Sequence, residues 1–262
     1  MKIHRKRYWL ALIFVFATAA WADEAVFLAL QGDGSASIAI DENAQRAFII
    51  DGGRSGARGI MGGRVGEDDP LGNLLARGVR ELFVVCSHPH RDHMSGLISL
   101  IEDPRIERFD RLVFIDNDYE QRTGRESLIA MYRKRGGAGP GGGNGPGTDH
   151  VSIQGKSPFE PGGGGMAVEL YAGAHGADEH DRAIISAYTI TEGDRANTVV
   201  DFDDASKALI DEWSREADLK PKTLVISHHG SKYNYRKDIL DAYPSVRDVV
   251  ITVNDANRYF HL

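Results

Sequence analysis

The sequence has little cysteine and no apolar run long enough to cross a membrane as a helix. One cysteine among 262 residues excludes an internal disulfide and any zinc site built from several cysteines. The longest apolar run, residues 8–20, is shorter than the ~20 residues that a membrane-spanning helix needs. With 26% charged and 42% hydrophobic residues, the chain is too apolar for disorder, and its length fits one large domain or two small ones.

Basic residues are concentrated at the start of the chain. Lys2, Arg5, Lys6 and Arg7 precede the apolar run, and Ala20-Trp21-Ala22 follows it, an order typical of a secretory signal peptide. We expect residues 1–22 to be removed by cleavage after Ala22, which gives a periplasmic or secreted product without membrane attachment. An uncleaved anchor is the alternative. Without those four residues, 27 Lys and Arg stand against 38 Asp and Glu, a net charge of −11 that disfavours binding of extended duplex DNA.

Residues 23–262 read as one domain in which strands and helices alternate, which predicts a layered α/β body. A stretch rich in glycine, residues 136–165, interrupts this pattern, and we expect it to be a flexible insertion. Asp203 or Asp204 is predicted to cap the amphipathic helix that follows them. The predicted strands are 25–30, 37–40, 47–50, 82–86, 112–115, 168–171, 183–191, 198–202, 223–227 and 249–253, and the predicted helices are 71–79, 95–101, 126–134, 205–216 and 237–242.

The segment with the clearest chemistry follows the apolar strand 82–86. It reads Ser87-His88-Pro89-His90-Arg91-Asp92-His93, with three imidazoles and one carboxylate within six residues. Side chains that follow a buried strand project into the crevice at its carboxyl end. Nitrogen ligands with one carboxylate suit Zn²⁺, and also Mn²⁺ or Fe²⁺. A loop of solvated histidines is the alternative, but the neighbouring sequence is not rich in histidine.

This segment resembles the H-x-H-x-D-H signature of the metallo-β-lactamase superfamily, whose fold is an αββα sandwich with a metal centre at one edge. Other segments resemble the ComEC/Rec2-like branch in the same order along the chain: Phe27–Asp33, Phe48–Gly53, Val225–Lys232 and Asn257–His261. The resemblance implies this fold for residues 23–262. Since relatives continue beyond their last histidine motif, it also implies a domain truncated near Leu262.

The resemblance further implies a metal-ligand set. His88 and His90 match ligands of a first metal, and Asp92 and His93 match ligands of a second, with Asp92 also orienting the catalytic water. Asp203, with Asp201 as its rival, matches the bridging carboxylate, while His228, with His229 as its rival, matches the last ligand. His175 is expected as the third ligand of the first metal, with His180 as the alternative.

Several further residues have expected roles near this site. Asp51 is expected to hydrogen-bond the loop backbone beside the metals rather than to bind them. Cys86 adjoins the ligands but lies in an apolar strand, which favours a place in the core. Ser231 and Lys232 are either contacts for an anionic group of the substrate or parts of a polar loop.

The function expected from the resemblance is an exported metal-dependent hydrolase that uses a hydroxide bridging two zinc ions. Its substrate is expected to be a small molecule or nucleotide-type compound, with a phosphodiester favoured. The alternatives are a lactam or lactone hydrolase, and a non-catalytic metal- or ligand-binding module of the same fold.

Overall fold

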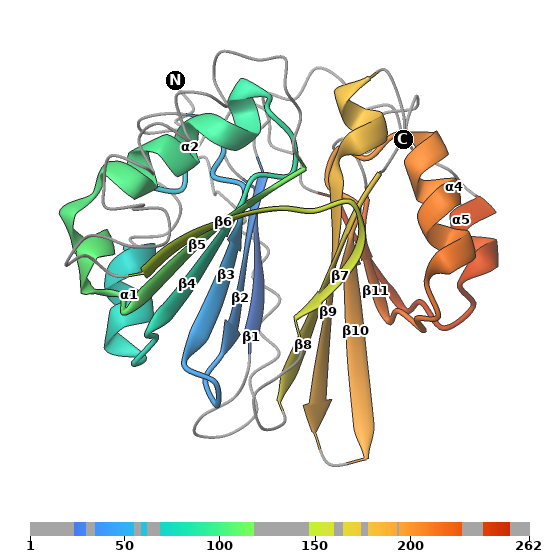
Figure 1. Ribbon diagram of the computed structural model, residues 1–262. Coiled ribbons are helices and arrows are strands. Elements are labelled where there is room, and N and C mark those ends of the chain that lie inside the picture. The colour runs from blue at the N-terminus through green and yellow to red at the C-terminus, as the bar shows by residue number, and fades with distance from the viewer. Residues whose placement is uncertain are drawn as a thin grey trace, which may run out of the picture.

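Two mixed β-sheets form the centre of the computed structural model, which describes residues 24–29, 35–54, 59–61, 69–117, 147–159, 165–173, 178–192, 194–226 and 238–251 (Figure 1). The first sheet has the spatial order of its sequence: β1 (Glu24–Ala29), β2 (Ser35–Asp41), β3 (Arg46–Ile50), β4 (Glu81–Val85), β5 (Arg111–Asp116) and β6 (Gly147–Ser152). The second runs, edge to edge, through β12 (Asp248–Val250), β11 (Thr223–Val225), β10 (Arg195–Asp201), β9 (Ile184–Glu192), β8 (Met166–Ala172) and β7 (Gly155–Phe159).

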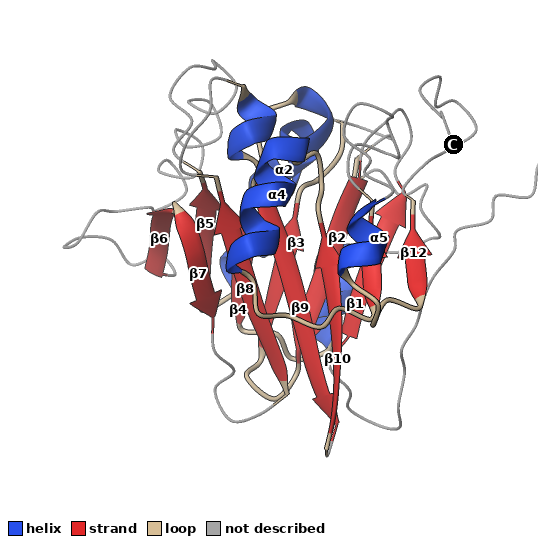
Figure 2. Cartoon of the chain, turned by 90° about the vertical axis from the view of Figure 1, so that its right-hand side faces the viewer, coloured by secondary structure: helices blue, strands red, loops and turns tan. Residues whose placement is uncertain are grey.

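Helices cover the outer face of each sheet. Against the first sheet lie α1 (Pro70–Ala76), α2 (Arg91–Glu102) and the 3₁₀ turn η2 (Pro104–Arg108). Against the second lie α4 (Lys207–Glu216) and α5 (Asp238–Ala242), as Figure 2 shows. The layer order is therefore αββα, which confirms the predicted fold class. Within the described residues, no helix combines the length and the apolarity needed to span a membrane.

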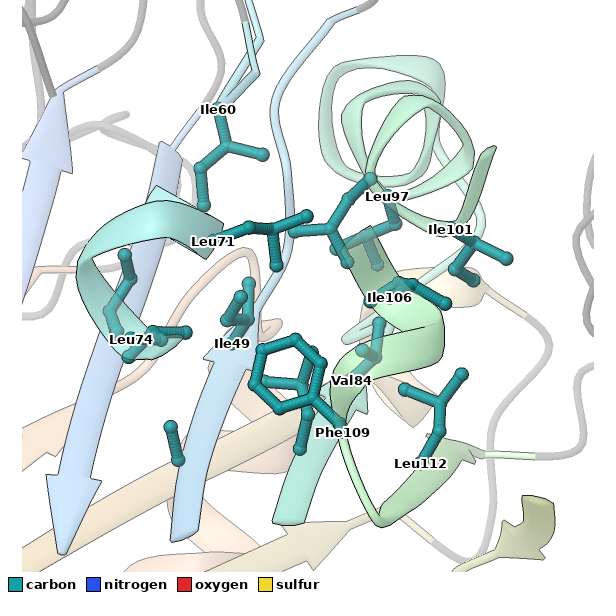
Figure 3. Close-up of a cluster of buried hydrophobic side chains, with 14 of the residues drawn as sticks. Ile49, Ile60, Leu71, Leu74, Val84, Leu97, Ile101, Ile106, Phe109 and Leu112 are labelled. Carbon is teal, nitrogen blue, oxygen red and sulfur yellow. The ribbon is translucent and has the colours of Figure 1, made fainter. Parts of the chain in front are cut away.

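Apolar side chains fill each of the three interfaces between layers. Successive residues of a strand point to opposite faces, so Phe48 and Phe83 pack between the sheets while Ile49 and Val84 pack under the helices. Figure 3 shows this second group, with Ile49 of β3, Leu71 of α1 and Leu97 of α2 in one cluster. Because β3, β4 and β5 are buried on both faces, they read as continuous apolar runs in the sequence.

The carboxyl ends of the parallel strands in both sheets lie where the loops of the candidate site begin. In the first sheet Ile50, Val85 and Ile115 are register partners at the carboxyl ends of β3, β4 and β5. In the second sheet, β10 ends at Asp201, which pairs with Val225 of the parallel strand β11. The loops after β3 and β4 in the first sheet and after β10 in the second sheet therefore begin at these strand ends.

The N-termini of two helices differ from the predictions. Helix α2 begins at Arg91 rather than near Ser95, so Asp92 and His93 lie in its first turn. Helix α4 is capped by Ser206, whose hydroxyl accepts a hydrogen bond from Leu209 N, and not by Asp203 or Asp204.

The predicted flexible insertion 136–165 is corrected for residues 147–159. Strands β6 and β7 lie within it, and they pair with β5 and β8, which satisfies the backbone groups along one edge of each strand. An ion pair between Arg111 and Asp149 further joins β6 to β5. The glycine-rich residues 136–146 lie outside the described residues.

Candidate metal centre

The first half of the site is built where β4 passes into α2. Cys86 N donates to Ile115 O, which continues the sheet by one residue before the chain turns at Ser87. His90 occupies the N-cap of α2, and His93 lies one turn into the helix. His88 and His93 are fully buried, so their imidazoles face the protein interior rather than solvent. Cys86 belongs to the apolar core, as predicted.

The second half of the site comes from the other sheet. After β10 the chain makes a tight turn in which Asp203 has φ +44° and Asp204 follows it, both buried. Because Ser206 caps α4, neither Asp203 nor Asp204 serves as the N-cap of this helix. The 3₁₀ turn η3 (Glu179–Arg182) carries His180, whose carbonyl accepts from Ser206 N. Ile184 N donates to Ser87 O, which joins this sheet to the first half.

One group of ligand atoms comprises His88, His90, His180 and Asp204, all within 4.8 Å of one another. His88 Nε2 lies 3.0 Å from His90 Nδ1 and 3.7 Å from Asp204 Oδ2, and His180 Nε2 lies 4.0 Å from the same oxygen. Ligands held ~2.0–2.2 Å from a tetrahedral ion are ~3.3–3.6 Å apart. These three distances differ from that range by only a few tenths of an ångström.

His93 faces carboxylates on both sides of its ring. Its Nε2 lies 3.3 Å from Asp204 Oδ2, and its Nδ1 lies 2.7 Å from Asp51 Oδ2 and 3.3 Å from Asp203 Oδ1. His88, His93 and Asp203 form a second group whose ligand atoms lie within 4.8 Å. Asp204 is thus close to imidazoles of both groups.

Asp51 supports this arrangement from the end of β3. It is 1% exposed and accepts hydrogen bonds from Ser87 N at 2.9 Å, Ser87 Oγ at 2.6 Å and the ring of His93 at 2.7 Å. These contacts confirm the prediction that Asp51 binds the loop backbone beside the site. They also fix the ring orientation of His93 with its Nε2 directed at Asp204.

Four acidic side chains are buried at the site: Asp51, Asp201, Asp203 and Asp204. Burial, followed by the charge of Asp203, raises the pKa of Asp51 to about 7 and that of Asp201 to about 8. Burial alone would lower the pKa of His93, but the nearby charges of Asp203, Asp204 and Asp51 hold it well above its usual value. Such groups are stabilised by cations placed among them.

The donor set fits a divalent metal. His93 Nε2 and Asp203 Oδ2 are buried and make no hydrogen bond to any described residue. Unsatisfied buried polar atoms are costly, and a bound ion is one way to satisfy them. Imidazole nitrogens with carboxylate oxygens are ligands that zinc prefers.

The structure brings together four of the predicted site residues: His88, His90, His93 and Asp203. Asp92 is half-buried in the first turn of α2 and belongs to neither group formed by the described residues. His175 and His228 lie outside the described residues, as do His229, Ser231 and Lys232.

Two residues of the site were not predicted as first choices. His180, the alternative to His175, lies in the first group. Asp204 was predicted only as a helix cap, although its Oδ2 lies within 4.0 Å of three imidazoles, those of His88, His93 and His180. Asp201, the predicted rival of Asp203, instead accepts a hydrogen bond from Asp203 N.

Comparisons with known proteins return similarities of structure at low sequence identity. The metallo-β-lactamase SMB-1 is 16% identical over 85% of this chain and 83% of that chain, with a TM-score of 0.45. A diphosphatase from the PhnP family is 13% identical over 83% and 72%, with a TM-score of 0.46. The metallo-β-lactamase fold protein YhfI from Bacillus subtilis is 14% identical over 75% and 64%, with a TM-score of 0.42. No protein-family model and no curated protein sequence matches the chain.

Proposed function

We propose that this protein is a metal-dependent hydrolase with a dinuclear centre that holds zinc. The observation that carries the proposal is the position of Asp204, whose Oδ2 lies 3.3 Å from His93 Nε2, 3.7 Å from His88 Nε2 and 4.0 Å from His180 Nε2. A buried carboxylate among imidazoles from two sheets is suited to bridge two cations. Pairs of ions held in this way serve in hydrolysis of phosphate esters and amides.

Each residue has a defined task in the proposed site. His88, His90, His180 and Asp204 would hold one ion, and His93 and Asp204 would contribute to the other. Divalent ions supply a coordinated water of lowered pKa and take up charge on the attacked oxygen. Asp51 holds the ring of His93 through its Nδ1.

The remaining predicted ligands complete the proposal for the second ion. Asp92, in the first turn of α2, is proposed to bind it and to orient the attacking water. His228 is proposed as its last ligand, and His175 stays a candidate that competes with His180 for the first ion. Manganese or iron is proposed as the alternative to zinc in this set of ligands.

The substrate is proposed to be a small phosphodiester of the nucleotide type. Two sequence features support this choice: the resemblance of Val225–Lys232 to the ComEC/Rec2-like branch, and the acidic net charge of residues 23–262, which disfavours extended duplex DNA. Lactams, lactones and a non-catalytic binding role are the alternatives that the experiment below separates.

The test begins with metal analysis of the purified chain and a panel of substrates. We expect two zinc ions per chain, hydrolysis of a model phosphodiester such as bis(p-nitrophenyl) phosphate, and loss of turnover on chelation with recovery on adding zinc. Turnover of a lactam or lactone alone would replace the proposed substrate. Metal binding without turnover of any member of the panel would favour the non-catalytic module.

His180→Ala tests the assignment of the first ion. Because His180 lies in the first ligand group, we expect zinc content to fall towards one ion per chain and kcat/KM to fall by more than about 100-fold. The matched control is His150→Ala, since His150 lies on β6, pairs with Asp116 and belongs to neither group. Two zinc ions in His180→Ala, measured by elemental analysis, would transfer this role to another residue.

Export is proposed from the N-terminal pattern alone. The basic residues, the apolar run 8–20 and the Ala20-Trp21-Ala22 site support removal of residues 1–22 and a periplasmic or secreted enzyme. Mass spectrometry of the protein recovered outside the cytoplasm is expected to give an N-terminus at Asp23. A product that retains Met1 would contradict cleavage.

A further inference from the structure

Asp203 lies behind the imidazoles that the proposed metal centre uses. Its Oδ1 lies 3.3 Å from His93 Nδ1 and its Oδ2 lies 3.4 Å from His88 Nδ1. Asp204 lies on the opposite side of both rings, near their Nε2 atoms. The two consecutive carboxylates therefore approach the same pair of imidazoles from opposite sides.

The Nδ1 atoms already have partners that require a proton on them. His93 Nδ1 lies 2.7 Å from Asp51 Oδ2, a hydrogen-bond distance. Ser87 Oγ donates its proton to Asp51, so it accepts from His88 Nδ1 at 3.0 Å. With a proton on Nδ1, each ring has Nε2, on the side of Asp204, as the atom that would bind a metal. A carboxylate placed at Nδ1 strengthens this tautomer and makes Nε2 a better ligand.

The backbone of Asp203 is strained, although the charges of His93 and His88 stabilise its carboxylate. Its backbone has φ +44°, a region that glycine adopts readily and that costs other residues free energy. Its side chain is 95% buried, and its Oδ2 makes no hydrogen bond to a described residue. A glycine at this position would relieve the strain, but it would also remove a carboxylate that faces both imidazoles.

We propose that Asp203 is a positioning residue that raises the metal affinity of His88 and His93 through contacts with their Nδ1 atoms. This inference rests on the proposed metal centre. It assigns the bridging position to Asp204 and a supporting position to Asp203, although the sequence pattern favoured Asp203 as the bridge.

The test compares wild type with Asp203→Gly and Asp203→Asn in the full chain. Zinc affinity is measured by competition with a chromophoric chelator, and melting temperature is measured with zinc and with excess chelator. We expect both variants to keep two zinc ions but to bind them 10–100-fold more weakly. For Asp203→Gly we expect the same loss of zinc affinity, although glycine relieves the backbone strain at this position. Asp203→Asn tolerates positive φ, so it carries the affinity test independently of backbone strain.

Gln45→Gly is the matched control for strain. Gln45 also has a positive φ, +53°, but it lies in the exposed turn between β2 and β3, at the other end of β3 from Asp51. This variant is expected to raise the melting temperature without changing zinc affinity.

Each outcome decides between distinct conclusions. Loss of one zinc ion in both Asp203 variants would make Asp203 a ligand and overturn the inference. Zinc affinity equal to that of wild type would also overturn it, whatever the melting temperature. If wild type itself binds no zinc, manganese or iron, the proposed metal centre fails first, and the two failures are therefore distinguishable.

Discussion

Asp204→Asn is expected to abolish hydrolysis and to weaken zinc binding by more than about 100-fold, a larger loss than supporting residues of metal sites show. Burial would raise the pKa of Asp204, but the charges of His93 and His88 outweigh it and hold the pKa well below its usual value. The carboxylate is therefore charged at neutral pH. An amide of the same size lacks that charge and presents an N–H group to one of the imidazoles. Steady-state kinetics with the model phosphodiester and zinc competition measure both effects.

Asp41→Asn is the control for the general effect of changing a buried aspartate. Asp41 is fully buried and pairs with Arg46 at 3.0 Å, at the end of β3 that lies away from Asp51. This variant is expected to lower the melting temperature and to leave zinc affinity within about twofold of wild type. Full activity with two bound zinc ions in Asp204→Asn would exclude Asp204 as the bridging ligand.

The strands, and the burial of some of them on both faces, could be predicted because the apolar pattern that indicates them is local in the sequence. Runs such as Leu82–Cys86 are apolar throughout, which is typical of strands covered on both faces, and the histidine segment directly follows one of them. The start of α2 could not be predicted in the same way. The side chain of His90, at the N-cap, makes no capping hydrogen bond to the helix backbone, so the sequence carries no capping signal there.

The sequence also does not determine whether Asp203 or Asp204 caps α4 or lies in the metal site. Asp203, Asp204 and Ser206 all have side chains suited to cap a helix, and local rules do not rank them. Contacts distant in sequence select Ser206, since its hydroxyl donates to Asp181 Oδ1 at 2.6 Å and its N–H donates to His180 O. Those contacts release both carboxylates and place His180 beside them.

The edge strand β6 shows a different limit. Its neighbourhood is dominated by glycine, and composition alone indicated an insertion without structure. The strand is stabilised by its pairing with β5 along six residues, from Arg111 with Gly147 to Asp116 with Ser152. Ser152 Oγ also donates to Asp116 Oδ1 at 2.7 Å. The composition of a short segment gives no information on pairing with a strand 36 residues away.

Gly96→Ala is expected to destabilise the fold by about 3 kcal/mol or more, although alanine in a helix is usually favoured over glycine by ~1 kcal/mol. Gly96 lies in α2, where the helix meets the loop after β3. A Cβ on Gly96 would lie 2.9 Å from Gly52 Cα and closer still to the Gly52 carbonyl. Since the obstructing atoms are backbone, the loop itself must move.

The same junction holds the metal ligands in place. Gly52 N donates to His93 O at 2.7 Å, and Gly96 N donates to Gly53 O at 2.8 Å, so displacing the loop moves both Asp51 and the first turn of α2. We therefore expect Gly96→Ala to lower the melting temperature by roughly 6–12 °C and also to weaken zinc binding. Ser99→Ala in the partly exposed part of the same helix is the control, with expected changes within about 2 °C and unaltered zinc affinity. A higher melting temperature in Gly96→Ala would show that helix propensity outweighs the backbone contact, and the close junction between α2 and β3 would then be incorrect.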